Sequence, residues 1–377
     1  MPAARIRIAY CLDNLDVGGT EMNAVRTAER LDRERFDAIL CTLHADGPLK
    51  SRFIAAGIPV HPFQISGLVS VSAFREGRRL TQLLRAERID IVHAHDRYTN
   101  VFAVGPARAA GAALLTSKRW GTSTRAHELL NRYAWRRSDA VLGNSAAVAR
   151  DLAVNDGVPA DRIVTIPNFL DAADFEPMPD AERASLRQAL GLTHDALVVG
   201  SVSNLRAVKD QASLVRAIAR LAPEWQNLRL VLVGEGDQRG PLTALAADLG
   251  IADRVVLAGA RADGRRLQAL FDVSVLCSRS EGFPNAVIEA MAAARAVVGT
   301  NVGGIPDAVT DGENGLLVPV GDPVALARAI GSLLADPDLR GTMAAAGRAR
   351  ARRDFAAASV MAQLEGIYQR LVGLQRQ

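Results

Sequence analysis

The sequence predicts an α/β protein built from two doubly wound domains, each with a parallel sheet. Short apolar runs alternate with helical patterns along both halves, a proline-rich segment interrupts this alternation near the middle, and 377 residues are too many for one ordinary core. Hydrophobic residues make up 49% of the chain, so each half can bury a core of its own. We expect a cleft between the domains at the carboxyl edges of their strands, where such sheets bind ligands.

The first domain is expected over residues 1–170. Helical patterns, such as those over residues 21–31 and 74–88, separate its β-branched and apolar runs, which is the alternation of a parallel sheet. The predicted strands span residues 5–11, 37–43, 58–63, 89–93, 113–117, 140–143 and 163–166.

Residues 171–190 are expected to link the domains, because prolines and acidic residues break the alternation there. The second domain is expected over residues 191–352, and residues 353–377 are expected to return to the first domain as an amphipathic helix, since no strand follows it. The predicted strands of the second domain span residues 197–202, 229–233, 254–258, 273–277, 296–299 and 315–318.

Composition excludes several classes of protein. A net charge of +4 does not indicate a nucleic-acid-binding protein, although residues 1–170 hold 23 Lys and Arg against 17 Asp and Glu. Cys11, Cys41 and Cys277 are widely spaced and form no disulfide or metal pattern, which favours a reducing compartment. The sequence has no signal-peptide pattern and no long uninterrupted apolar run, so we expect a cytoplasmic protein.

Residues 278–320 are the most informative part of the chain. They begin with Ser-Arg-Ser-Glu-Gly-Phe-Pro-Asn-Ala-Val-Ile-Glu-Ala-Met-Ala and continue as a glycine-studded run to Val320. Glu281 falls in a short loop after a strand pattern, Pro284 fits the first position of a helix, and Glu289 lies inside that helix. A strand, a glycine turn and a helix N-terminus together form an anion site at the carboxyl edge of a parallel sheet. With two flanking carboxylates, this site suits a ligand with phosphates and many hydroxyls, such as a nucleotide sugar.

Two cations follow the first predicted strand of the second domain. Arg206 and Lys209 precede Asp210, which we expect to cap a helix over residues 211–221. Cations beside a helix N-terminus can neutralise a leaving diphosphate without a metal ion. The alternative is that both are solvated surface charges.

Paired glycines follow the first strand of the first domain. Gly18 and Gly19 allow a close approach of the backbone to a ligand at the N-terminus of the next helix, or they form an ordinary turn. Neither this turn nor residues 233–237 has the glycine spacing of a dinucleotide-binding loop.

Polar residues also follow two later strands of the first domain. His93 and His95 share a strand face, but no further His or Cys ligand lies near, so a metal site is disfavoured. We expect His95 or Asp96 to orient a substrate hydroxyl, with a structural histidine as the alternative. Lys118 and Arg119 are expected to face an acidic acceptor or a donor phosphate, or else to form a surface patch.

Two charged segments have simple alternatives. Asp336-Pro337-Asp338 resembles a metal-binding motif of some sugar transferases, but its place between two predicted helices indicates helix capping. The predicted helix over residues 74–88 carries a basic face that is either solvated or docks on an anionic membrane surface. Its basic residues are Arg75, Arg78, Arg79, Arg85 and Arg88.

The chain resembles the GT-B-fold retaining glycosyltransferases of family GT4, the glycosyl transferases group 1, over nearly its whole length. The resemblance is strongest over residues 196–325, and it implies two Rossmann-like domains facing a central cleft. The motifs that carry it are Gly18-Gly19-Thr20-Glu21, Arg206 with Lys209, residues 281–289, residues 303–307 and residues 314–318.

The resemblance also implies roles for the diphosphate and base. Gly19, next to Gly18, would offer its amide to the donor phosphates, and Arg206 and Lys209 would hold the diphosphate. Arg261 would contact the base through its backbone.

For the sugars, the resemblance implies that Glu281 hydrogen-bonds the transferred sugar and that Glu289 binds the ribose hydroxyls. Many members have a histidine after the fifth strand, where this chain has Ser117-Lys118-Arg119-Trp120, which leaves His95 or His127 as substitutes. The backbone lying against sugar or phosphate would be that of Gly282, Phe283, Pro284 and Asn285.

The activity implied is a hexosyltransferase reaction that retains anomeric configuration and needs neither metal nor cofactor. The expected donor is a nucleoside-diphosphate sugar, and the expected acceptor is a carbohydrate or lipid-linked hydroxyl in polysaccharide, lipopolysaccharide or glycolipid synthesis, with the protein at the inner face of the membrane. The alternatives are a nucleotide-sugar epimerase on the same fold and a non-catalytic sugar-binding relative.

Overall fold

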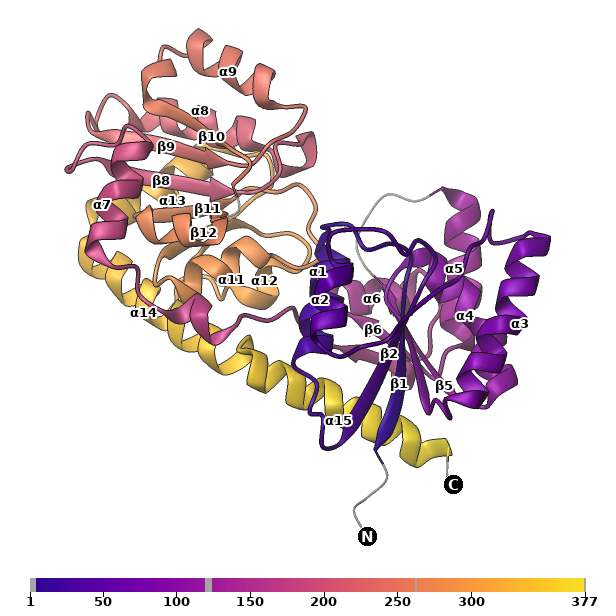
Figure 1. The fold of residues 1–377 in the computed structure, drawn as a ribbon. Coiled ribbons are helices and arrows are strands. Elements are labelled where there is room, and N and C mark those ends of the chain that lie inside the picture. The colour runs from indigo at the N-terminus through magenta and orange to yellow at the C-terminus, as the bar shows by residue number, and fades with distance from the viewer. Residues whose placement is uncertain (1–4, 119–123, 262, 376–377) are drawn as a thin grey trace. The chain divides into compact units, whose positions relative to one another are not determined.

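The computed structural model describes residues 5–118, 124–261 and 263–375, and the chain forms two compact units (Figure 1). Unit 1 comprises Met1–Asn168 with Ala358–Gln377, and unit 2 comprises Phe169–Ala357. Each unit is an α/β domain around one parallel sheet, which confirms the predicted fold class.

The described part of unit 1 contains a seven-stranded parallel sheet with the order β3-β2-β1-β4-β5-β6-β7. The order reverses between β1 and β4, which makes this position the topological switch point, where doubly wound sheets bind ligands. The strands are β1 (Ile6–Leu12), β2 (Phe36–Thr42), β3 (Val60–Pro62), β4 (Ile91–Ala94), β5 (Ala113–Lys118), β6 (Ala140–Gly143) and β7 (Ile163–Thr165).

Polar caps define where the helices of unit 1 begin. Ser70, Asp96, Thr124 and Ser145 each accept a hydrogen bond from a backbone amide in the first turn of the helix that follows. The helices are α1 (Gly19–Glu29), α2 (Lys50–Ala55), α3 (Val71–Ala86), α4 (Arg97–Ala110), α5 (Arg125–Arg137), α6 (Ala146–Val154), the 3-10 helix η1 (Ala160–Arg162) and the C-terminal α15 (Ala357–Gln375).

The C-terminal helix α15 packs on unit 1, as predicted. Tyr368 on this helix is fully buried; its hydroxyl lies 2.8 Å from Nδ1 of His93, and its ring meets Phe36 edge-on at a centroid distance of 6.0 Å. Glu365 pairs with Arg35 at 3.3 Å. The helix therefore completes the core of unit 1.

Unit 2 repeats the architecture: among its described residues, a six-stranded parallel sheet has the order β10-β9-β8-β11-β12-β13, with the switch point between β8 and β11. The strands are β8 (Leu197–Val202), β9 (Leu228–Val233), β10 (Val255–Gly259), β11 (Val273–Leu276), β12 (Ala296–Thr300) and β13 (Leu316–Val318). The α-helices are α7 (Asp180–Ala189), α8 (Gln211–Leu221), α9 (Arg239–Asp248), α10 (Gly264–Leu267), α11 (Asn285–Ala292), α12 (Ile305–Ala308), α13 (Pro323–Ala335) and α14 (Pro337–Asp354), and the 3-10 helices are η2 (Ala172–Phe175), η3 (Ala207–Lys209), η4 (Ala252–Arg254) and η5 (Gln268–Leu270).

Local differences from the sequence predictions have simple causes. The expected linker contains α7, whose first turn carries the acidic residues Asp180 and Glu182 that favour a helix N-terminus. Pro284 precedes α11 as its N-cap residue rather than starting it. The capping role predicted for Asp336 is confirmed, because its side chain accepts from the amide of Leu339 at 2.9 Å.

The cysteines are less isolated than their sequence spacing indicates. Cys11 and Cys41 are direct neighbours in the register of β1 and β2, although all three cysteines, each in the described part of the chain, are free and buried. The hydrogen bond with Cys41 and, to a smaller extent, burial raise the pKa of the Cys11 thiol.

Candidate functional site

Lys209 and Glu281 meet at the switch point of the unit 2 sheet, one after β8 and the other after β11. Nζ of Lys209 lies 2.5 Å from Oε2 of Glu281, and Oγ of Ser278 donates to the same oxygen at 3.1 Å. The Lys209 and Glu281 side chains are only 22% and 13% exposed, so solvent screens the pair weakly. A charged pair therefore lies at the position where doubly wound sheets bind ligands.

Direct hydrogen bonds fix the two loops that carry this pair. The Cys277 thiol donates to the carbonyl oxygen of Lys209 at 3.3 Å, and the Arg279 amide donates to the carbonyl oxygen of Val208 at 2.8 Å. Lys209 and Glu281 are consequently held by the backbone as well as by their own contact.

Asp210 is the N-cap residue of α8, as predicted, but its side chain makes no capping hydrogen bond. Its backbone is left-handed, with φ 50°, instead of the extended conformation that capping residues usually adopt. Its carboxylate instead accepts from the Ser213 hydroxyl at 3.0 Å and pairs with Arg279 at 3.1 Å, which ties the loop after β8 to the loop after β11.

Two glycines after β12 support Glu281. Gly303 has φ 56°, and a Cβ atom there would lie 1.9 Å from the carbonyl oxygen of Glu281. The amide of Gly304 donates to that same oxygen at 3.1 Å. Only glycine allows this close approach of the two loops.

Arg206 lies on the same turn as Lys209. Its side chain is exposed, and its carbonyl oxygen accepts from the Lys209 amide at 2.8 Å. The structure thus gathers Arg206, Lys209 and Glu281, all predicted from sequence, at one edge of unit 2.

The other donor residues predicted for the second domain also lie in unit 2. Oε1 of Glu289 lies 2.9 Å from Nε of Arg265, a partner that the sequence did not suggest, and Glu289 is only 10% exposed. Arg261 follows β10 and makes two hydrogen bonds to Asp263, at 2.8 and 2.7 Å. Between Glu281 and Glu289, Gly282, Phe283 and Pro284 are buried, and Asn285 is exposed at the start of α11.

In unit 1, Gly19 begins α1 and Gly18 precedes it as the N-cap residue. A Cβ atom at Gly18 would lie 2.2 Å from a carboxylate oxygen of Glu21, whereas nothing lies within 4 Å of one at Gly19. The space on the side-chain side of Gly19 is therefore open, whereas Glu21 fills that of Gly18.

Asp96 has a structural role at the switch point of unit 1. Oδ1 accepts from the amides of Tyr98 and Thr99, and Oδ2 accepts from the Asp13 amide at 2.7 Å and from the Thr99 hydroxyl at 2.9 Å. Burial raises its pKa to about 6, with a smaller contribution from the charge of Asp13, although the hydrogen bonds oppose the shift. Asp96 therefore caps α4 and joins it to the loop after β1.

His95 is buried, with 1% of its surface exposed, and its ring stacks on His93 at a centroid distance of 3.9 Å. This environment fits the structural alternative and does not support contact with a substrate hydroxyl. Among the residues that the structure describes, no group of His, Cys, Asp and Glu is placed to hold a metal ion.

Lys118 does not face an anionic ligand as predicted. Its ammonium pairs with both Asp151 and Asp156, lies 4.9 Å from the centre of the Trp135 ring, and is only 13% exposed. The two carboxylates neutralise its charge, a pairing that sequence spacing did not reveal. The other predicted cation, Arg119, lies outside the described residues.

An open pocket of about 720 Å³ lies within unit 1. Its lining includes Asp96, Lys118 and His127, and Thr124 fixes the His127 ring through a 2.9 Å contact to Nδ1. Of the two histidines expected as substitutes, His127 therefore has access to a pocket. The other lining residues include amides and carboxylates suited to hydroxyl groups, namely Asn14, Asn131, Glu128 and Asn155.

In the part of the chain that the structure describes, no helix combines the length and apolar character that a bilayer span requires.

Two family models match the chain, one in each unit. The model described as "Glycosyltransferase Family 4" matches residues 17–174, and the model described as "Glycosyl transferases group 1" matches residues 194–336.

Curated relatives show the same kinship. An N-acetyl-alpha-D-glucosaminyl L-malate synthase of Bacillus anthracis is 31% identical over 56% of this chain and 54% of its own length. A D-inositol 3-phosphate glycosyltransferase of Acidothermus cellulolyticus is 36% identical over 57% of this chain and 50% of its own length. The chain thus spans about half the length of these relatives.

Among solved structures, HepE of Anabaena in complex with UDP and glucose is similar along both chains. The two share 25% identity with a TM-score of 0.85, over 97% of this chain and 100% of the other.

Proposed function

We propose that this chain, a member of the family 4 glycosyltransferases, transfers a sugar from a nucleoside diphosphate to an acceptor hydroxyl. The observation that carries the proposal is the Lys209–Glu281 pair at the switch point of unit 2, with Arg206 on the same turn. Cations and a carboxylate at one sheet edge match a ligand that joins a diphosphate to a polyhydroxyl sugar.

In the proposed reaction, the bond between the anomeric carbon and the diphosphate oxygen breaks, and its electrons leave with the diphosphate. Lys209 and Arg206 stabilise this developing negative charge, which is where preorganised donors have their largest effect on rate. The acceptor oxygen attacks the face that the diphosphate leaves, and the departing phosphate takes the acceptor proton. The anomeric configuration is thereby retained. Lys209 and Arg206 neutralise the charge of the leaving diphosphate, a role that a metal ion has in other enzymes.

Glu281 is proposed to accept hydrogen bonds from the transferred sugar, and Glu289 from the ribose hydroxyls. Both are mostly buried carboxylates in unit 2, with 13% and 10% of their side chains exposed, so hydrogen bonds to them are charge-assisted and weakly screened. The backbone amide of Gly19 and that of Arg261 remain candidates for the diphosphate and the base. UDP in the similar HepE structure supports a uridine donor as the first one to test.

The acceptor is proposed to be a hydroxyl of a carbohydrate or lipid-linked carbohydrate, bound in the unit 1 pocket. Its lining provides amide and carboxylate groups that exchange hydrogen bonds with sugar hydroxyls. His127, with access to this pocket, is the better candidate for contact with the acceptor than the buried His95.

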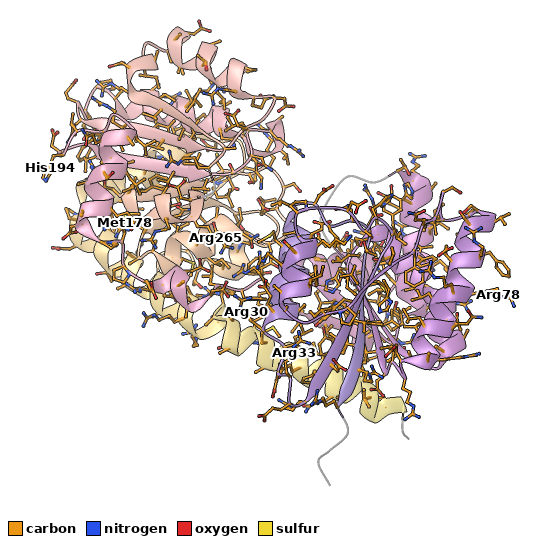
Figure 2. The ribbon with its side chains drawn as sticks, viewed as in Figure 1. Arg30, Arg33, Arg78, Met178, His194 and Arg265 are labelled. Atoms are coloured by element: carbon orange, nitrogen blue, oxygen red, sulfur yellow. The ribbon has the colours of Figure 1, made fainter. Side chains whose placement is uncertain are left out.

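The N-terminal end of α3 supports docking on an anionic membrane surface. Val69, Val71 and Phe74 are 89%, 86% and 69% exposed, an unusual arrangement for large apolar side chains in water. Arg75 and Arg78 lie beside them and are exposed, and Figure 2 shows Arg78 projecting from the helix. Apolar residues that enter the interface and cations that meet acidic headgroups are the two elements of peripheral binding.

Flotation with vesicles tests this surface. Wild-type protein should float with vesicles that contain phosphatidylglycerol and not with phosphatidylcholine alone, and V71E/F74E should abolish flotation. Equal flotation of wild type and variant would refute a role for the end of α3.

The transfer reaction is tested by incubating the protein with UDP-, GDP-, ADP- and dTDP-sugars, each first screened for a rise in melting temperature, because a ligand of the folded state stabilises it. A productive donor should yield nucleoside diphosphate and a glycoside whose anomeric configuration, determined by NMR, is the same as that of the donor sugar. Conversion of the donor to an epimer without acceptor would establish the epimerase instead, and tight donor binding without any turnover would establish a non-catalytic relative.

A further inference from the structure

We propose that Arg265 is a positioning residue that holds Glu289 for the ribose of the donor, and that it thereby sets a preference for ribonucleotides over deoxyribonucleotides. This inference rests on the proposed function, because it takes the nucleotide to bind at Glu289.

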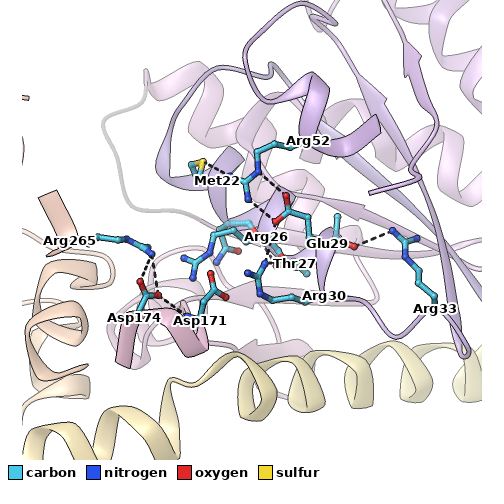
Figure 3. Close-up of polar contacts among 12 residues, drawn as sticks. Met22, Arg26, Thr27, Glu29, Arg30, Arg33, Arg52, Asp171, Asp174 and Arg265 are labelled. Carbon is cyan, nitrogen blue, oxygen red and sulfur yellow. Dashed lines mark hydrogen bonds and ion pairs between the residues drawn. The ribbon is translucent and has the colours of Figure 1, made fainter. Parts of the chain in front are cut away.

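Arg265 bridges two carboxylates from different elements of unit 2. Its Nε lies 2.9 Å from Oε1 of Glu289 on α11. Its Nη1 lies 3.2 and 3.3 Å from the two carboxylate oxygens of Asp174 on η2, a contact visible in Figure 3. One guanidinium therefore connects α11 with η2.

The η2 end of this bridge is firmly anchored. Oδ2 of Asp174 also accepts from the Asp171 amide at 2.7 Å, which fixes the carboxylate on its own turn. The carbonyl oxygen of Phe175 accepts from Arg348 on α14 at 2.5 Å, and the guanidinium carbon of Arg352 lies 5.6 Å from the centre of the Phe175 ring. Asp174 is thus a fixed point against which Arg265 can hold Glu289.

Electrostatics favours a cation between the two carboxylates. Glu289 and Asp174 are 10% and 17% exposed, so without a cation between them two weakly hydrated carboxylates would repel each other. A cavity of about 50 Å³ borders Arg265, Asp174 and Glu289, so close packing does not by itself hold the Glu289 side chain in place. Loss of Arg265 should therefore allow the Glu289 carboxylate to rotate.

A carboxylate that is ionised and fixed is the form that recognises a pair of neighbouring hydroxyls, because both the charge and the direction of its lone pairs matter. Arg265 need not touch the nucleotide to have this effect. Its loss should weaken binding of nucleotides with an intact ribose more than binding of deoxyribose forms, which already lack one of the two hydroxyl bonds.

The neighbouring residue offers a matched control. Arg266 has the same exposed fraction, 41%, and makes two hydrogen bonds to Glu182 at 2.7 and 2.6 Å. Its partner lies on α7 and is not one of the proposed donor residues. R266Q removes an arginine from the same helix and breaks an equally close ion pair.

The experiment measures dissociation constants of UDP, 2′-deoxy-UDP and 3′-deoxy-UDP by calorimetry for wild type, R265Q, R265K and R266Q. If wild type binds GDP or ADP in place of UDP, the corresponding deoxy forms are used. Wild type should prefer the ribonucleotide over at least one deoxy form by about tenfold, the equivalent of one hydrogen bond to a charged group. R265Q should lose most of that preference, R265K should keep part of it, and R266Q should match wild type.

The ratio of affinities separates positioning from general destabilisation, because a loosened fold would weaken all three nucleotides together. The inference is overturned if folded R265Q keeps the wild-type preference, or if wild type shows no preference at all. R265K decides the question if R265Q does not fold. Failure of the proposed function has a different signature, namely that wild type binds none of UDP, GDP and ADP.

Discussion

Replacement of Lys209 by methionine is the most informative perturbation of the unit 2 site. Methionine keeps most of the length of the side chain and removes its charge. Because Lys209 is proposed to stabilise the leaving diphosphate, its loss should lower kcat by about 10²–10³, the effect of removing one preorganised donor, or roughly 3–4 kcal/mol. The assay is release of UDP from a UDP-sugar, with acceptor or with water as the nucleophile.

The same change has a cost in stability that must be separated from catalysis. Glu281 is only 13% exposed, and without Lys209 the donor to its Oε2 that remains among the described residues is the Ser278 hydroxyl. An underpaired buried carboxylate destabilises the fold by about 1–3 kcal/mol. The double variant K209M/E281Q removes that charge, so it should recover stability without recovering turnover.

Lys50 provides the control lysine. It pairs with Asp46 at 3.6 Å on the surface, where Asp46 is fully exposed, so K50M should change neither melting temperature nor turnover appreciably. A folded K209M protein with kcat within about threefold of wild type would refute the leaving-group role, since that factor is well under the value of one such donor.

Four further outcomes are expected. E289A should raise the dissociation constant of the donor about tenfold or more with a smaller effect on kcat, and calorimetry that shows unchanged affinity would exclude ribose contact. Turnover should persist in excess EDTA, whereas complete loss restored by magnesium would show a metal requirement. G303A should lower both melting temperature and activity, because its Cβ would lie 1.9 Å from the Glu281 carbonyl oxygen at φ 56°; a fully active, stable variant would contradict this. The pKa of Asp96 is raised to about 6, so Asp96 stabilises the fold most below its unfolded pKa near 4 and loses that contribution as pH rises through 6. The free energy of unfolding of D96N relative to that of wild type, measured with denaturant, should therefore increase between pH 4 and pH 7 by up to about 3 kcal/mol. A difference that does not change with pH would argue against the pKa shift.

Local sequence patterns were sufficient to predict the parallel sheets and the loops that carry the unit 2 residues. β-branched runs and helical periodicity identified each strand, and Arg206, Lys209 and Glu281 follow two of these strands directly. Because carboxyl ends of parallel strands share one edge, their proximity followed from topology alone.

Partners brought together by long-range packing could not be predicted in this way. Lys118 is neutralised by Asp151 and Asp156, which lie more than 30 positions away, and Arg265 meets Asp174 across 91 positions. Such pairs leave no periodic signal, since each residue alone looks like an ordinary surface charge.

The most direct test of the central claim is a crystal structure of the protein with a bound nucleotide sugar, UDP-glucose being the first to try. We predict that the diphosphate oxygens lie within ion-pair distance of Nζ of Lys209 and of the Arg206 guanidinium, with no metal ion between them and with the ribose on Glu289. A diphosphate bound elsewhere, or one held through a metal ion away from these cations, would contradict it.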